Sequence, residues 1–213
     1  MEGVLALCSP VLGTVIISVG KLVEQVQALV QAQGSRRPLT GEELGFLRKV
    51  FGDTLHYEAI GIIEGRAGLF GLNPRPFTLG NTIYTKQGPV MADLLVHEAV
   101  HAWQYQQTGA RYAGEAVLAQ WLVPDAYNWR REIESRRKNE WIAMNREAQA
   151  QFIQDLWYLG ELRDNSGTIV QSGNGAFFNA AGETTTGHFR VYGNDYTALA
   201  QRAVQTVRAT SLS

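Results

Sequence analysis

The chain has 213 residues, of which 45% are hydrophobic and 18% charged, and this balance predicts a folded domain with a substantial core. Its 19 basic and 20 acidic side chains give a net charge of −1, so we expect no nucleic-acid partner. A single cysteine, Cys8, excludes an intrachain disulfide and leaves histidine and carboxylate side chains as the expected ligands of any metal ion.

Residues 3–20 form an uncharged run that is only marginally long enough for a membrane span, and Pro10 and Gly13 weaken that interpretation. A signal peptide is a poor match, because Glu2 precedes the run without any lysine or arginine. We favour a buried or partner-contacting helical segment over residues 1–35, with membrane contact through residues 3–20 as the less favoured alternative.

A linker at residues 33–38 marks a boundary near residue 35 and leaves residues 36–213 as one domain. The capping box from Thr40 to Glu43 predicts a short helix that runs through Phe51. We expect a strand over residues 56–63, a glycine-rich loop over 65–75 and a strand or hairpin over 77–85.

The next segment, residues 90–108, has the pattern of a helix that ends at Gly109. Further helices are expected over residues 111–122 and over a long stretch from 129 to 159. The mixed charges at 130–138 in that stretch would face solvent. A last helix is expected over 196–207, after a cap at Asn194–Asp195. Short strands are expected near residues 168–171 or 177–178. These elements predict a mainly helical α+β fold with a small sheet beside the helix at 90–108.

The helix at residues 90–108 carries the motif His-Glu-x-x-His, formed by His97, Glu98 and His101. Residues four apart share one helix face, with Cβ atoms about 5–6 Å apart, so both imidazoles can bind one metal ion. Glu98 lies beside that face, where it can reach a water molecule on the metal. Zinc hydrolases use this arrangement, and zinc is the cofactor that we expect.

Catalytic zinc sites usually hold three protein ligands and one water molecule. A third histidine in the pattern H-E-x-x-H-x-x-G-x-x-H is excluded, because Gln104 and Gln107 occupy the glycine and the last histidine positions. We choose Glu147 as the third ligand, since the small residues around it would let its helix approach closely. Glu140, one heptad earlier, is the alternative, ahead of four other downstream carboxylates: Asp125, Glu132, Glu134 and Asp155.

Several segments carry a family resemblance: residues 40–43, 50–53, the Leu-Gly-Asn-Thr-Ile-Tyr strand within 76–84, and 95–106. Together they resemble the DUF4157-type zincin domain of bacterial genomes, which often lies beside or is fused to Vgr and contractile-injection proteins. The resemblance covers roughly residues 38–155. It implies a zincin-like metallopeptidase fold for the domain at 36–213, with the small sheet beside the His-Glu-x-x-His helix.

The resemblance also implies roles for individual residues. His97 and His101 would be zinc ligands, Glu98 would be the catalytic base, and Glu147 takes the position of a glutamate ligand. The chain departs from the expected pattern at Gln149 and Gln151, where an acidic residue that supports a ligand would be expected.

The function expected from these residues is zinc-dependent hydrolysis of peptide bonds in a protein or peptide substrate. Glu98 would accept a proton from a zinc-activated water molecule and pass it to the leaving amine. The strand region at 77–85 would be the edge along which an extended substrate pairs. His188 and Tyr192, together with Tyr196, are the candidates for stabilising the oxyanion.

Two other functions stay open. The chain would in one case be a non-catalytic zincin-fold structural or adaptor component of a secretion or contractile-injection system, with a Vgr-like partner. In the other it would be a bacterial effector, exported or injected by a non-Sec route, whose apolar segment sorts it or inserts into a membrane.

Overall fold

The computed structural model of the protein describes Thr14, Ser18, Gly88 and residues 35–65, 76–86, 90–109 and 125–209. The expected segment at 1–35 therefore lies outside the described residues except at its last residue and at Thr14 and Ser18. The expected loop at 65–75, apart from its first residue, and the expected helix at 111–122 also lie outside them. Among the described helices, none combines the length and the apolar character that a membrane span requires.

The described chain contains both helices and small antiparallel or mixed sheets, and the α+β class predicted from the sequence is confirmed. The helices are α2 (Gly41–Phe51), η1 (Tyr57–Ala59), α3 (Ala92–Thr108), α5 (Trp129–Glu134), η3 (Trp141–Ala143), α6 (Arg146–Leu159), η4 (Ala176–Asn179) and α7 (Thr197–Ala209). The strands are β1 (Gly61–Glu64), β2 (Phe77–Leu79), β3 (Thr82–Thr85), β4 (Glu161–Asp164), β5 (Ile169–Ser172), β6 (Thr185–His188), β7 (Arg190–Val191) and β8 (Asn194–Asp195).

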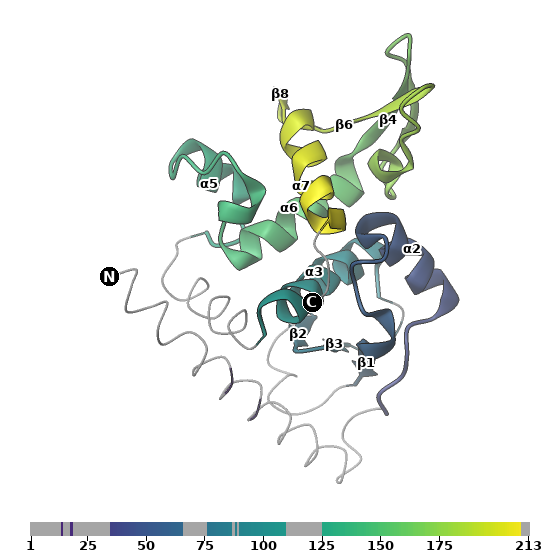
Figure 1. Ribbon diagram of the computed structural model, residues 1–213, viewed down its shortest axis with the longest axis vertical. Coiled ribbons are helices and arrows are strands. Elements are labelled where there is room, and N and C mark those ends of the chain that lie inside the picture. Colours follow the sequence, from purple (N-terminus) through teal and green to yellow (C-terminus); the bar gives the residue numbers. More distant parts are fainter. Residues whose placement is uncertain are drawn as a thin grey trace.

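A three-stranded sheet with the order β1–β3–β2 lies beside α3 (Figure 1). The expected hairpin is confirmed, because β2 and β3 pair antiparallel across a tight turn in which Gly80 adopts a φ of +63°. The parallel strand β1 begins later than predicted, at Gly61. The side-chain amide of Gln106 on α3 bonds both the backbone N–H and the backbone carbonyl of His56, and the chain passes through η1 before it joins the sheet.

Helices α3 and α6 pack against each other more extensively than any other pair of described elements. Both helices also bury alanines completely: Ala99, Ala102, Ala148 and Ala150. Small side chains of this kind allow neighbouring elements to come close. In Figure 1 the β1–β3–β2 sheet lies on one side of α3, whereas β4 and β6 lie at the far end of α6.

The single long helix predicted over residues 129–159 is wrong, because the chain forms α5, η3 and α6 instead. Helix α5 ends at Glu134, the chain turns at Arg137, whose φ is +56°, and Asn145 caps the start of α6. The predicted solvent-facing charge cluster is also wrong at Glu132, whose side chain is completely buried. Its carboxylate accepts hydrogen bonds from Arg136, Lys138 and the backbone N–H of Asn145, so the buried charge is paired.

A second sheet, in the order β5–β4–β6, follows α6. The strand expected near residues 168–171 is confirmed as β5, whereas the one at 177–178 is wrong, because Phe177 and Phe178 lie in η4. Gly175, with a φ of +77°, donates its N–H to the carbonyl of Trp157 and turns the chain into this short helix. The final helix is confirmed as α7, and the side chain of Asp195 accepts the N–H of Thr197 at its start.

Candidate metal centre

Helix α3 places His97 and His101 one turn apart on the face that meets α6. The centroids of their rings are 5.1 Å apart, at an interplanar angle of 72°. Each histidine is only 6% exposed. Both rings are therefore shielded from bulk water, and an imidazole that has lost its proton to a metal ion can serve as a ligand inside the protein.

Helix α6 brings Glu147 to the same point from the opposite side. Asn145 is the N-cap of α6, and its side-chain oxygen accepts the backbone N–H of Ala148 at 3.0 Å. The backbone N–H of Asn145 in turn donates to the Oε2 atom of Glu132 at 3.2 Å. Asn145 is therefore hydrogen-bonded both to α6 and to α5. These hydrogen bonds fix the position of Glu147, a residue that lies in the same turn and is 3% exposed.

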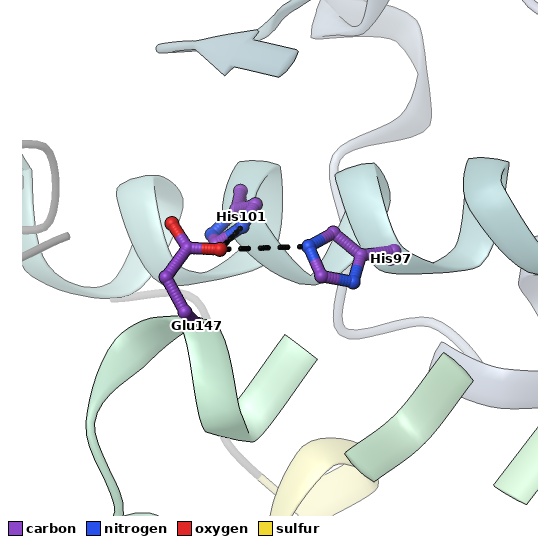
Figure 2. A group of neighbouring side chains, drawn as sticks. All are labelled: His97, His101 and Glu147. Carbon is purple, nitrogen blue, oxygen red and sulfur yellow. Dashed lines mark ion pairs between the residues drawn. The ribbon is translucent and has the colours of Figure 1, made fainter. Parts of the chain in front are cut away.

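The three side chains converge on one point between the helices, as Figure 2 shows. The Oε2 atom of Glu147 lies 3.3 Å from the Nε2 atom of His101 and 3.6 Å from the Nε2 atom of His97. Two ligands of a tetrahedral ion with bonds of about 2.0–2.2 Å are expected about 3.3–3.6 Å apart. The observed spacing therefore fits a divalent metal ion, and this buried group of three donors could bind one.

Charge within the centre is shared between His101 and Glu147. Burial alone would raise the pKa of Glu147, but the facing His101 and His97 outweigh burial and lower it well below its usual range. Burial would likewise lower the pKa of His101, yet the charge and hydrogen bond of Glu147 raise it to about 9. Without a metal ion the two residues therefore form an ion pair at neutral pH, and metal binding would displace a proton from His101.

This ion pair predicts how the stability of the metal-free protein depends on pH. The pKa of His101 is raised from 6.5 to about 9, so its contribution is complete below pH 6.5 and is lost as the pH rises through 9. The pKa of Glu147 is lowered, so its contribution is present above its ordinary pKa of 4.5 and is lost in acid. Urea unfolding of wild type and Glu147→Gln should show a wild-type advantage on the order of 1–3 kcal/mol at pH 5.5 that shrinks above pH 9. An advantage that is the same at pH 5.5 and pH 10 would contradict the ion pair.

Glu98 lies on the side of α3 that faces β2. The hydroxyl of Thr78 donates to its Oε2 atom at 2.8 Å and also approaches its backbone carbonyl at 3.1 Å. Burial raises the pKa of Glu98 above its ordinary value, although the nearby His97 and His101 oppose the shift. The carboxyl is thus a stronger proton acceptor than an exposed glutamate, and it belongs to the residue next to a proposed ligand.

The structure does not bring the oxyanion candidates to this centre. His188 pairs with Glu161 beyond the end of α6, about 20 Å along the helix axis from Glu147. Tyr192 is 84% exposed in the turn between β7 and β8, where the guanidinium of Arg130 covers its ring at 4.4 Å. Tyr196 packs edge-on against Trp129 at 4.8 Å.

The alternative third ligand is also placed elsewhere. Glu140 precedes η3, and its side chain is 61% exposed and faces Arg202, with 3.6 Å between the charged atoms. The heptad spacing that made it equivalent to Glu147 does not apply, because the chain between the two residues is not one continuous helix.

Sequence reasoning missed several neighbours of the centre. The ring of Tyr127 lies nearly parallel to that of His97, at 6.0 Å between centroids. Thr78 contacts Glu98, while Gln104 and Gln149 form a hydrogen-bonded chain behind His101. Of these residues, the sequence drew attention only to Gln149, which stands where an acidic residue that supports a ligand was expected. The others lie in a turn (Tyr127), in β2 (Thr78) and in α3 (Gln104), and their contacts depend on the tertiary fold.

The sequence matches no family model, and no curated protein or solved structure is detectably similar to it. The centre is therefore interpreted from its own geometry.

Proposed function

We propose that the protein is a zincin-like, zinc-dependent metallopeptidase. One observation carries the proposal: two buried histidines one helix turn apart meet a buried carboxylate from a second helix, and Glu98 lies beside them. The DUF4157-type resemblance is consistent with this proposal and forms part of it.

Zinc is the proposed metal because two imidazoles and one carboxylate are a typical ligand set for it. Structural zinc sites usually take four protein ligands, whereas catalytic sites take three and keep one position for water or substrate. Within the described part of the chain, the group consists of His97, His101 and Glu147. Three protein donors are the number that a catalytic zinc site uses.

The chemistry that zinc would supply when bound is a lowered pKa for water, near 7, and polarisation of a substrate carbonyl. Glu98 accepts the proton of the attacking water, for which its raised pKa suits it. The hydroxyl of Thr78 orients the carboxylate through the 2.8 Å hydrogen bond. The same carboxyl then donates the proton to the leaving amine, so that Glu98 is restored at the end of the cycle.

The proposed substrate is an extended protein or peptide segment. In the described sheet, β2 is an edge strand that pairs with β3 on one side. Since Thr78 of β2 contacts Glu98, a peptide that added to this edge would pass close to the catalytic base.

A peptide library tests the proposal directly. The purified protein, loaded with one equivalent of zinc, should cleave members of a proteome-derived library, as seen by mass spectrometry. A chelator should abolish cleavage, and added zinc should restore it. If a fully zinc-loaded protein cleaves nothing in the library or in intact protein mixtures, the metallopeptidase proposal fails.

A second candidate is a non-catalytic structural or adaptor component of a secretion or contractile-injection system with a Vgr-like partner. The burial of the centre favours it, because all three donor residues are at most 6% exposed. Stoichiometric metal without hydrolysis would support this candidate. Delivery of the protein as a bacterial effector by a non-Sec route belongs to the proposal as its biological setting, and toxicity that depends on Glu98 would distinguish an effector from an adaptor.

A further inference from the structure

A chain of side-chain hydrogen bonds runs behind the metal centre and joins α3 to α6. The Nδ1 atom of His101 lies 2.9 Å from the Oε1 atom of Gln104. The amide nitrogen of Gln104 donates to the Oε1 atom of Gln149 at 2.9 Å and to the carbonyl of Arg146 at 3.2 Å. Both glutamines are almost completely buried, so water does not readily replace these partners.

Backbone carbonyls determine the direction of every hydrogen bond in this chain. The amide nitrogen of Gln149 donates to the carbonyls of Ile142 and Met144, at 3.0 and 2.9 Å. A carbonyl can only accept, so the oxygen of the Gln149 amide must face Gln104. The carbonyl of Arg146 orients the Gln104 amide in the same way. The oxygen of Gln104 is therefore the atom that faces His101, and the Nδ1 atom of His101 must carry a proton.

We propose that Gln104 and Gln149 are positioning residues of the metal centre. They hold the Nδ1 atom of His101 as a hydrogen-bond donor, which leaves its Nε2 atom, 3.3 Å from the Oε2 atom of Glu147, as the nitrogen that would bind a metal ion. Gln104 also bonds the carbonyl of Arg146, the residue before Glu147, and so holds the two ligands in register across the helices. This inference rests on the metal-binding part of the proposed function.

We call the hydrogen-bonded chain of Gln104 and Gln149 behind His101 the relay. It consists of neutral amides, whereas a carboxylate commonly accepts the hydrogen bond of a metal-binding histidine. His97 has no such support within the described residues, because its buried Nδ1 atom has no hydrogen-bond partner there. The relay therefore acts on one histidine of the pair. Loss of the relay should change the position and hydrogen bonding of the His101 ring. The ring of His97, which lies against Tyr127, should stay in place.

The Nδ1 proton can be detected without any metal ion. NMR of the metal-free wild-type protein shows whether the Nδ1 atom of His101 carries a proton that exchanges slowly with water. We expect such a proton, because Nδ1 donates to the buried Oε1 atom of Gln104. An Nδ1 atom without a proton would overturn the relay, whether or not the protein binds zinc, so this result is separate from a failure of the proposed function.

Zinc affinity tests the relay through residues that touch no metal. By competition with a chromophoric chelator, Gln104→Met should weaken zinc binding about 10- to 100-fold and Gln149→Met about 5- to 10-fold. Gln151→Met is the matched control, because Gln151 lies on the same helix and bonds Asp155, and its zinc affinity should equal that of wild type. In metal-free Gln104→Met, NMR should show that the Nδ1 proton of His101 exchanges with water faster than in wild type. Wild-type zinc affinity in both Gln104→Met and Gln149→Met would overturn the proposal.

Discussion

Glu98→Gln is expected to lower kcat for peptide hydrolysis by about 100- to 10,000-fold while zinc stays bound at one equivalent. Glutamine keeps the size of the side chain and can still bond Thr78, but it cannot accept a proton from the attacking water. The carboxyl of Glu98 contacts Thr78 and is not one of the three metal donors, so the ligand set is intact in this variant. Steady-state kinetics on a cleaved library peptide, together with elemental analysis, measures both quantities.

The control for this substitution is Glu134→Gln, which removes an exposed carboxylate at the end of α5 and should leave kcat unchanged. Hydrolysis by Glu98→Gln at the wild-type rate would show that another group accepts the proton. A simultaneous loss of zinc would instead place Glu98 among the ligands, contrary to its contact with β2.

Glu147→Ala should weaken zinc binding by more than about 100-fold, because even the loss of a residue that only supports a ligand weakens binding 10- to 100-fold. Two buried histidines cannot hold a divalent ion as tightly as they do with a carboxylate that neutralises part of its charge. The matched substitution Glu140→Ala removes the exposed glutamate that faces Arg202 and should keep the wild-type affinity.

Elemental analysis and chelator competition on both variants decide between the two glutamates. Full zinc occupancy in Glu147→Ala would mean that the ion is held elsewhere. A thermal unfolding curve of each metal-free variant shows whether the fold has survived, since Glu147 also forms the ion pair with His101.

Local signals explain which parts of the fold could be predicted. The capping box of α2, the turn at Gly80 and the helix that ends at Gly109 each depend on a few neighbouring residues, and all three are present. The convergence of His97, His101 and Glu147 was also predictable. Two of these residues share a helix face by spacing alone, and the small residues around the third allow close helix packing.

Contacts between distant segments explain the rest. A run of charged residues is usually a solvated surface, and nothing in the local sequence of Glu132 shows that Lys138 and the N–H of Asn145 would surround it in the interior. These contacts lie across the break between α5 and α6, which the local sequence did not indicate either. His188 and Tyr192 were chosen by residue type, which carries no information about their distance from α3.

The position of Glu147 also matters for a chain with a single cysteine. His101 and Glu147 lie roughly 45 residues apart, and a disulfide that closed a loop of this length would remove chain entropy from the unfolded state worth about 4 kcal/mol. A metal ion bound to residues of both helices would close the same loop of chain and would need no cysteine. The same three side chains would then cross-link α3 to α6 and hold the catalytic metal. Loss of the metal would therefore lower the stability of the protein as well as abolish the proposed hydrolysis.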